Sequence, residues 1–354
     1  MSKTVQTAVV GVTGYAGAEL ARLLLHHPRL KGTPPVFAGR VDAKDEARGG
    51  TPLAEIHPQL AGSYTGALKQ EPFSWDLLAS RSVDVLFLAT PHEQSREWVP
   101  EALTRGLRVI DLSGAWRLND AANRAIYNFT DEGAEQAVAT QAQAVYGMPE
   151  LHRAQIAGAR LVANPGCYAT SVILALKPLV AAGVLDLTHG IVADSKSGVS
   201  GAGKAATAKT HFMYAADNLS AYGVFTHRHT GELLEQIALN RDQIVFTPHL
   251  LPIPRGILST IYVRFSTAQT TESISQIYSE FFANSPMVRL YHQALPQIQY
   301  SVRTSYADIG FQLAHDGQRA VIVSCLDNLL KGASSQAVQN LNVMQGCHEA
   351  EGLE

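Results

Sequence analysis

Apolar positions in the first half of the chain fall into short runs, separated by turn residues and by segments of helical composition. Strands are predicted over residues 4–12, 35–39, 83–89 and 107–112, and helices over residues 18–26 and 94–105. The run at 83–89 is almost continuously apolar, as in parallel strands that are covered on both faces. Strands alternating with helices in this way predict an α/β, Rossmann-type dinucleotide-binding domain.

The pattern changes beyond residue 167, where strands outnumber helices. Strands are predicted over residues 190–194, 244–249, 256–265, 288–291 and 320–326, with a helix over residues 271–283. Strands gathered around few helices predict a second, α+β domain with an antiparallel or mixed sheet. A last helix with apolar periodicity is predicted over residues 333–344.

Cys167 lies where a predicted strand gives way to a predicted helix. A short apolar run stops at the Asn-Pro-Gly turn of residues 164–166, and the apolar segment 168–176 has no helix breaker before Pro178. Free N–H groups at a helix N-terminus favour a thiolate and can lower a cysteine pKa from about 8.5 to about 3.5–7.5. They could also hold an oxyanion. We therefore predict a nucleophile, the alternative being a small buried cysteine that only packs.

Three glycines, Gly11, Gly14 and Gly17, follow the first predicted strand and precede the first predicted helix. Glycine lets the backbone approach a pyrophosphate, and the helix N-terminus attracts its charge. The spacing differs from Gly-x-Gly-x-x-Gly, so a tight turn without a ligand is the alternative. Arg40 follows the second strand, where an arginine suits the 2′-phosphate of NADP. The nearby Asp42 weakens this prediction, and Arg40 is otherwise an exposed loop residue.

Other turns carry further candidates. Thr90 and Pro91 end the third predicted strand, and the carboxyl end of such a strand should lie near the cofactor. Arg117, beyond the fourth strand, either binds an anion or is a surface residue. The Ser- and Gly-rich stretch 195–204 is predicted to be a flexible linker or an anion-binding loop. It is not a Walker A loop, because Ala205 follows the lysine.

His227 and His229 flank an arginine, and an extended segment would place both imidazoles on one side. Histidine is the usual proton shuttle near neutral pH and also binds metals. His211 and His249 offer no convincing spacing for further ligands, so we predict no metal. A structural or surface pair of histidines is the alternative.

Composition narrows the class of protein. The chain has 354 residues, of which 46% are apolar, which is enough for two globular domains. A net charge of −3, without a Lys- or Arg-rich run, disfavours nucleic acid and anionic membranes as partners. No signal peptide is apparent, and the three cysteines are too widely spaced for a disulfide framework or a metal site. These features predict a cytoplasmic enzyme.

Several motifs occur in a matching order over essentially the whole chain, and together they resemble the N-acetyl-gamma-glutamyl-phosphate reductase family of arginine biosynthesis. They cover residues 11–20, 111–114 with Arg117, 146–151, 164–168, 197–203, 227–229, 248–250 with 255–257, and 327–333.

The resemblance implies an architecture and a set of site residues. The NADP-binding domain would cover residues 1–165, the catalytic and dimerisation domain 166–326, and a C-terminal helix, 327–354, would return to the first domain. The protein would be a homodimer or homotetramer. The expected catalytic residues are Cys167 and His227. Expected cofactor-binding residues are Gly11, Thr13, Gly14, Tyr15, Ala16, Gly17, Arg40, Thr90, Pro91, Ser197, Gly198 and Asn328. Expected substrate-binding residues are Arg117, His229, Glu232 and Arg255.

The implied reaction is the reversible, NADP-dependent reductive dephosphorylation of N-acetyl-L-glutamyl 5-phosphate to N-acetyl-L-glutamate 5-semialdehyde. Cys167 would form a thioester that is then reduced, and His227 would handle the proton on the carbonyl oxygen. Arg117 and the loop at residues 197–198 would hold the substrate phosphate or inorganic phosphate. Glu232 and Arg255 would touch the rest of the substrate or orient the histidine.

The sequence departs from the family pattern at three places. Gly231 stands where proline is usual, residues 251–254 differ from the commoner loop, and the serine that often precedes Arg40 is missing. The last departure weakens the prediction of NADP. Aspartate-semialdehyde dehydrogenase, a carrier-linked aminoadipyl phosphate reductase and a non-catalytic NADP sensor are the alternatives.

Overall fold

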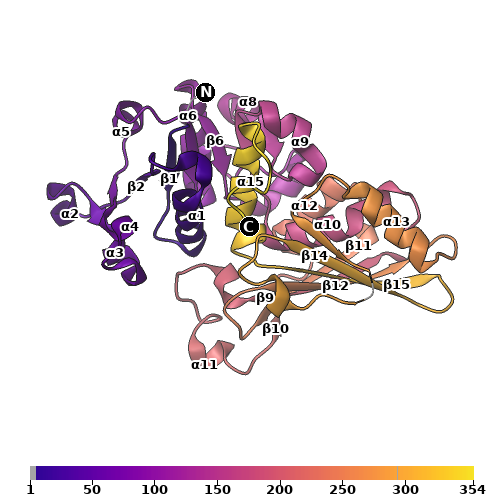
Figure 1. Cartoon of the computed structure of the whole chain (residues 1–354). Helices are drawn as coiled ribbons and strands as arrows, with labels where there is room; N and C mark the ends of the chain where they lie inside the picture. The colour runs from indigo at the N-terminus through magenta and orange to yellow at the C-terminus, as the bar shows by residue number, and fades with distance from the viewer. Residues whose placement is uncertain (1–4, 293) are drawn as a thin grey trace.

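The computed structural model describes residues 5–292 and 294–354, so residue 4 of the first predicted strand lies outside the described residues. Two sheets form the framework of the molecule (Figure 1). The first has eight strands in the order β3-β4-β2-β1-β5-β6-β8-β7, and all neighbours are parallel except β3 and β4. Its strands are β1 (Thr7–Val10), β2 (Val36–Gly39), β3 (Thr51–Pro52), β4 (Lys69–Pro72), β5 (Val85–Leu88), β6 (Arg108–Asp111), β7 (Ala144–Tyr146) and β8 (Leu161–Ala163).

Helices connect the strands of this sheet, as a parallel order requires. They are α1 (Tyr15–His26), α2 (Ala43–Ala47), α3 (Leu53–Ile56), α4 (Tyr64–Ala67), α5 (Trp75–Ser80), α6 (His92–Thr104), α7 (Ala121–Arg124), α8 (Glu135–Gln141) and α9 (Pro149–Gly158). The strands β1 and β5 are buried along their whole length, since both faces of the sheet are covered. The predicted Rossmann-type domain is therefore confirmed.

The second sheet has seven strands in the order β10-β11-β9-β12-β15-β14-β13 and is mixed, as predicted. Two of its neighbouring pairs, β9 with β11 and β13 with β14, are parallel, and the other four are antiparallel. Its strands are β9 (Ile191–Gly198), β10 (Ser220–Ala221), β11 (Ile244–Leu251), β12 (Ile257–Arg264), β13 (Val288–Tyr291), β14 (Ala307–Leu313) and β15 (Arg319–Leu326).

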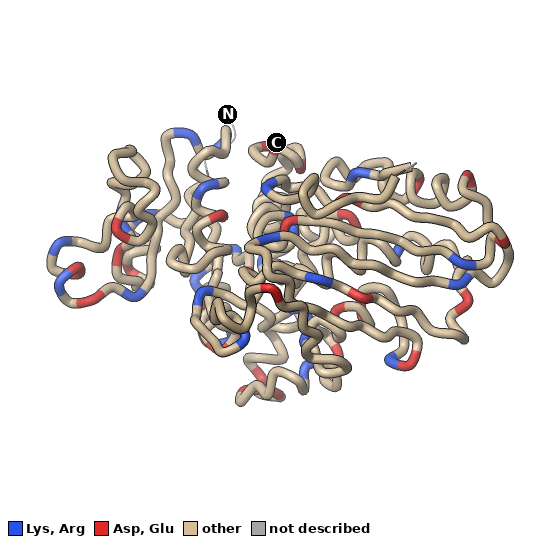
Figure 2. The backbone as a smooth tube through the Cα atoms, turned by 90° about the horizontal axis from the view of Figure 1, so that it is seen from below, with Lys and Arg blue, Asp and Glu red and all other residues tan. Residues whose placement is uncertain are grey.

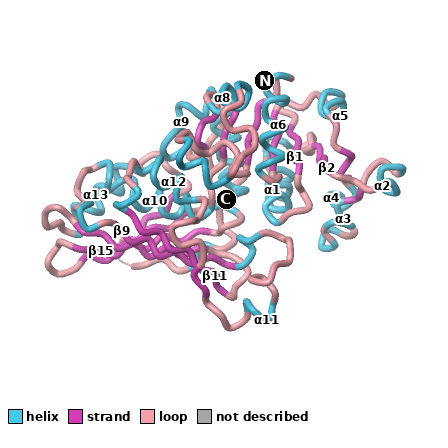
Figure 3. Tube along the Cα trace, turned by 180° about the vertical axis from the view of Figure 1, so that it is seen from behind, coloured by secondary structure: helices cyan, strands magenta, loops and turns pink. Residues whose placement is uncertain are grey.

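Helices α10 (Cys167–Ala181), α12 (His229–Ile237) and α13 (Thr271–Phe281) lie on one side of this second sheet (Figures 1 and 3). The short helices of this half are α11 (Phe212–Ala215), which lies apart from these three, and α14 (Ile298–Ser301). Residues of α10, α12 and α13 share an apolar core with β9, β11, β12, β14 and β15. On the sheet's other face, Val192 and Tyr262 are exposed.

The last helix of the chain packs against the first domain. After a π-helical turn at Leu330–Ser334, α15 (Ser335–Met344) contacts α1, α9 and β6. Its apolar side chains join those of α1, β1 and β5 in one core. Lys331 is fully buried before this helix, with its Nζ 2.7 Å from Oε1 of Glu150 on α9. The exact domain boundaries given above stay predictions.

Three local predictions are wrong, and one strand was missed. Helix α10 continues through Pro178 to Ala181, because Leu176 and Leu179 stay buried in the core. Strand β9 extends to Gly198, so the predicted loop from residue 195 begins as a strand that β11 and β12 pair on both sides. The pair of histidines does not lie on an extended segment, since α12 begins at His229. Strand β14 was not predicted.

Charged residues of both signs are interspersed along the chain (Figure 2). Many of them form ion pairs at the surface, such as Arg48 with Glu55 at 2.6 Å. Among the described residues, no helix has the length and apolar character that crossing a membrane requires.

Candidate active site

Cys167 is the first residue of α10, as predicted, and Gly166 is its N-cap. The turn before the thiol is held by three groups. The backbone N–H of Gly166 donates to Oε2 of Glu232 at 2.9 Å. Nε of Arg117 donates to the carbonyl oxygen of Asn164 at 2.7 Å, and the Asn164 side chain donates to the carbonyl of Ala333 at 3.0 Å. The position of the thiol is therefore set by contacts from three separate parts of the chain.

The predicted low pKa of Cys167 is wrong for the protein without ligands. Burial raises the pKa of this thiol to about 11, although the backbone N–H groups of Tyr168 and of Cys167 itself act to lower it. Arg117 also lowers it, but the negative charge of Glu232 works in the opposite direction. Desolvation by the surrounding protein thus outweighs the effect of the helix N-terminus.

Glu232 is the centre of a buried polar cluster. It is fully buried on α12, accepts a hydrogen bond from Tyr146 Oη at 2.7 Å, and lies 3.2 Å from Nη1 of Arg117. Burial disfavours the charged form of Arg117, but Glu232, Tyr127, Tyr146 and Asp111 together outweigh this, and the pKa of the guanidinium is raised. Oε1 of Glu232 is also 4.0 Å from Nε2 of His229. These contacts favour the orienting role among the two roles predicted for Glu232.

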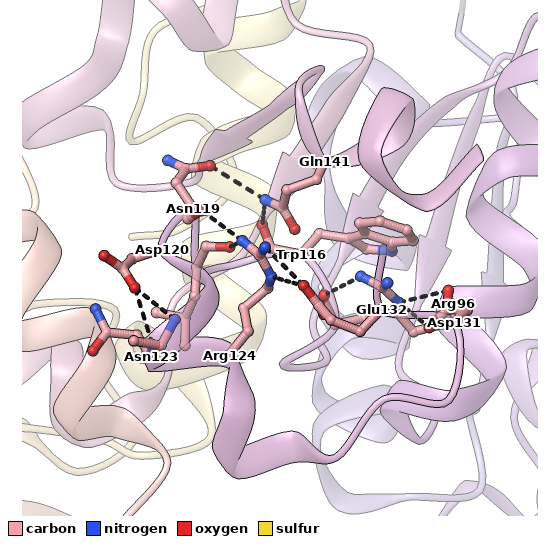
Figure 4. Close-up of polar contacts among 12 residues, drawn as sticks. Arg96, Trp116, Asn119, Asp120, Asn123, Arg124, Asp131, Glu132 and Gln141 are labelled. Carbon is pink, nitrogen blue, oxygen red and sulfur yellow. Dashed lines mark hydrogen bonds and ion pairs between the residues drawn. The ribbon is translucent and has the colours of Figure 1, made fainter. Parts of the chain in front are cut away.

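The segment that follows Arg117 is fixed by further ion pairs (Figure 4). Arg124 lies 2.8 Å from Glu132, and Arg96 lies 3.0 Å from Asp131. These pairs connect α6 and α7 with the loop before α8.

The two histidines lie beside Cys167 in different surroundings. His229 contacts the turn, and a Cβ on Gly166 would overlap its imidazole. His227 packs edge-on against three aromatic rings, with centroid distances of 5.6 Å to Tyr168, 5.6 Å to Tyr222 and 5.4 Å to Phe246. Burial lowers the pKa of both imidazoles, that of His227 to about 3. Both are therefore neutral in the free protein at neutral pH.

Cys167, His227 and His229 line a cavity of about 600 Å³. Its cationic side chains are Arg117, Lys209 and Arg228, and no carboxylate is among the described residues that line it. Such a cavity suits a substrate with more than one negative charge. Sequence reasoning assigned no role to Lys209, which lies in no pattern that distinguishes it from a surface residue, or to Arg228, although Arg228 stands between the two candidate histidines.

The glycine turn lines a second cavity of about 650 Å³, and Thr210 lines both cavities. Gly11 has φ of +99°, and a Cβ there would overlap the carbonyl of Ala89, so the turn is too tight for other residues. Thr13, Gly14 and Tyr15 line this cavity. They stand at the N-terminus of α1, where an anionic group is favoured.

Arg255 also lines this second cavity and is not among the residues that line the cavity of Cys167. Its Nη1 lies 2.6 Å from Glu19 of α1, and its Nε lies 3.1 Å from Asp327. Burial acts to raise the pKa of Glu19, but Arg255 prevails and the pKa is lowered. Arg255 therefore connects the two domains beside the glycine turn. Sequence reasoning assigned no role to Glu19, or to Lys204, whose Nζ is 3.4 Å from the carbonyl oxygen of Thr13.

The remaining predicted residues lie around these two cavities. Arg40 is exposed directly after β2, and Pro91 is the N-cap of α6. Thr90 Oγ1 is 3.0 Å from Ser95 Oγ, which donates to the buried Asp111. Ser197 lines the Cys167 cavity, and Gly198 contacts the backbone before Arg255. Asn328 accepts a hydrogen bond from the N–H of Gly256. Ala16 accepts a hydrogen bond from Ser334 through its carbonyl.

Within the described ranges, 5–292 and 294–354, no three His, Cys, Asp or Glu side chains come together as possible metal ligands.

Two family models match the chain. Residues 6–159 match the NAD binding domain of semialdehyde dehydrogenase, and residues 167–328 match its dimerisation domain. The N-acetyl-gamma-glutamyl-phosphate reductase of Geobacter sulfurreducens is 41% identical over 99% of this chain and 98% of its own. The chain belongs to the N-acetyl-gamma-glutamyl-phosphate reductase family. The same name is carried by a Methanocaldococcus jannaschii protein that is 39% identical over 98% of this chain and 97% of its own.

Solved structures show how widely the fold of this reductase family occurs. Aspartate semialdehyde dehydrogenase II of Vibrio cholerae superposes with a TM-score of 0.69 at 17% identity, over 97% of this chain and 98% of that chain. The Candida albicans enzyme, solved with NADP, gives 0.65 at 14% identity, over 98% and 99%. The chain is therefore an oxidoreductase with a domain that binds a nicotinamide dinucleotide and a domain of the dimerising type.

Proposed function

We propose that this chain catalyses the NADP-dependent reductive dephosphorylation of N-acetyl-L-glutamyl 5-phosphate to N-acetyl-L-glutamate 5-semialdehyde, a reversible step of arginine biosynthesis. The observation that carries this proposal is the position of Cys167, at the N-terminus of α10 in a cavity with three cationic side chains. A substrate with a carboxylate and a phosphate matches that charge. The names of the relatives support the choice of substrate.

The thiolate of Cys167 attacks the carbonyl carbon of the acyl phosphate, and phosphate leaves to give a thioester. Reduction of the thioester gives a thiohemiacetal, which collapses to the aldehyde and the thiolate. Arg117, which is already tied to Glu232 and to backbone carbonyls, holds its charge near the sulfur. Lys209 and Arg228 line the same cavity and would bind the anionic groups of the substrate.

The second cavity is the proposed dinucleotide site, because the glycine turn lines it at the N-terminus of α1, where an anionic group is favoured. Thr13, Gly14 and Tyr15 would hold the pyrophosphate, and the exposed Arg40 would take the 2′-phosphate of NADP. When bound, the nicotinamide supplies the hydride. We further propose a cytoplasmic homodimer or homotetramer.

The test is an assay of reduced cofactor with NADP⁺, inorganic phosphate and N-acetyl-glutamate semialdehyde, with aspartate semialdehyde as the competing substrate. Phosphate-dependent reduction with the acetylated aldehyde alone is expected, together with its loss in Cys167→Ser. Cys347→Ser is the matched control, because Cys347 lies outside both cavities. Equal rates with both aldehydes, or activity in Cys167→Ser, would refute the proposal.

A further inference from the structure

The hydrogen bonds of His227 determine which of its ring nitrogens carries the proton. The backbone N–H of His229 donates to Nδ1 of His227 at 3.1 Å. A nitrogen that accepts a hydrogen bond uses its lone pair and carries no hydrogen, so in the neutral ring the hydrogen is on Nε2.

His227 packs among aromatic rings and lines the same cavity as Cys167. Tyr168, Tyr222 and Phe246 pack edge-on with its ring, and the His229 ring centroid is 4.7 Å away. In the described part of the chain, no hydrogen-bond partner is found for Nε2 of His227, which lines the same cavity as Cys167. The Nε2–H group is therefore available to a ligand in that cavity.

A second proton on His227 is unfavourable for two reasons. It would have to sit on Nδ1, where the N–H of His229 already points, so that two hydrogens would face each other. The ring is also partly desolvated, and Arg228 and His229 oppose a positive charge there more than Glu232 favours it.

We propose that His227 acts as a neutral hydrogen-bond donor, through Nε2–H, to the carbonyl oxygen of the substrate, and that it does not transfer a proton. This role rests on the proposed function and revises the acid–base role that was expected for His227. Donors aimed at a developing oxyanion typically accelerate a reaction about 10²–10³-fold.

The chemistry needs no proton at the carbonyl oxygen. Formation of the C–S bond by the thiolate breaks the C–O bond to phosphate, and the departing phosphate takes up the one proton of the overall reaction from solvent. Reduction adds a hydride to the carbonyl carbon and gives the thiohemiacetal oxyanion, while the dinucleotide is oxidised. The oxyanion then re-forms the C=O bond as the C–S bond breaks, which regenerates the thiolate. A hydrogen-bond donor that stabilises the oxyanion formed when the thiolate attacks the carbonyl carbon, and then the thiohemiacetal oxyanion, is therefore sufficient.

Two substitutions separate a donor from a proton-transfer group. His227→Gln keeps an amide N–H group near the position of Nε2, whereas His227→Asn keeps only an acceptor near the position of Nδ1. We expect His227→Gln to stay within about tenfold of the wild-type kcat and His227→Asn to lose about 10²–10³-fold. Thermal unfolding of both variants shows whether they are folded. Equal losses in both folded variants, with rescue of His227→Asn by added imidazole, would overturn the proposal.

A measurement without turnover tests the tautomer directly. Long-range ¹⁵N–¹H correlation of histidine-labelled protein without ligands, assigned by the signal that is lost in His227→Gln, should show Nδ1 without hydrogen and Nε2 with it near neutral pH. A protonated Nδ1 would refute the inference. This result does not depend on the substrate, so a failure of the proposed function would appear separately, as a wild-type protein inactive on N-acetyl-glutamate semialdehyde.

Discussion

The thiol of Cys167 is protonated at neutral pH in the free protein, because burial raises its pKa to about 11. Each catalytic cycle nevertheless ends with the thiolate, since collapse of the thiohemiacetal expels it. The sulfur therefore needs to lose its proton once before the first turnover, and no base has to act in every cycle. This explains how a neutral His227 is compatible with thiol chemistry.

Alkylation of Cys167 reports this pKa. Only the thiolate reacts with iodoacetamide, and its fraction rises with pH below the pKa. We expect the inactivation rate to rise about tenfold per pH unit between about pH 7 and about pH 10. The measurement is residual activity against time in the wild-type protein. The extent of alkylation of Cys167→Ser gives the background labelling of the other cysteines. A rate that is constant above pH 7 would contradict the raised pKa.

Replacement of Glu232 should destabilise the protein more than replacement of its neutral partner. Glu232→Gln leaves the buried Arg117 without a counter-charge, which typically costs about 3–5 kcal/mol. The matched variant Tyr146→Phe removes one hydrogen bond to the carboxylate and should cost about 1.5–3 kcal/mol. Chemical denaturation gives both free energies of unfolding. Equal losses of unfolding free energy in the two variants would contradict the prediction that the charge of Glu232 is needed to compensate Arg117.

At this scale the sequence identified the reacting residues better than their environments. The Asn-Pro-Gly turn was enough to predict Cys167 at the start of a helix, because turn chemistry is local. The burial that reverses its pKa depends on segments that are distant in the sequence, such as the one that holds Gly332, where an added Cβ would lie 2.7 Å from Cβ of Cys167. The ion pair of Arg255 with Glu19 could not be predicted for the same reason, since it joins residues that only the fold brings together.

Among the elements, the π-helical turn before α15 lies directly against the proposed nucleophile, Cys167. A Cβ on Gly332 in this turn would lie 2.7 Å from Cβ of Cys167. The turn thus forms the wall against which the first residue of α10 rests. Glycine is required there by the close approach of two chain segments.

Gly332→Ala should push Cys167 away from its position. We expect a loss of kcat of about 10²-fold, since misplacement of a reacting atom by about 1 Å can have such an effect. The KM of the cofactor should change little. Gly158→Ala is the matched control, because a Cβ at the end of α9 meets no atom within 4 Å. Unchanged kcat in a folded Gly332→Ala protein would show that the turn moves to accommodate the added Cβ without displacing Cys167.

Helices and strands with a regular repeat of apolar residues were predictable from the sequence. Strands that form because neighbouring strands pair with them were not. Strands β5 and β6 and helix α13 were found from local patterns. Strand β14 was missed because Gly310 interrupts its pattern, and the end of β9 because serines and glycines resemble a loop. Ser195 is in fact buried and donates to Ser259 on the neighbouring strand. Tertiary pairing decides such segments.

In the whole molecule, Arg255 links the domains at the glycine turn, next to the cavity proposed for the dinucleotide. Arg255→Gln breaks its pairs with Glu19 and Asp327. We expect the KM for NADP to rise about tenfold, equivalent to about 1.4 kcal/mol, with little change in the KM of the aldehyde. Arg264→Gln, at the far end of β12, is the control. A selective rise in the aldehyde KM would instead support the substrate role first expected for Arg255.

The position of helix α15 has a consequence for folding during translation. The first domain consists of residues made early, but its core includes Val338 and Leu341 of α15, and Glu150 meets its buried partner Lys331 only near the end of the sequence. Chains emerge from the ribosome N-terminus first, at about 5–20 residues per second. The apolar surface that α15 covers in the first sheet's core therefore stays exposed until the whole second domain has been synthesised. We expect the first domain to depend more on chaperones during translation than the second.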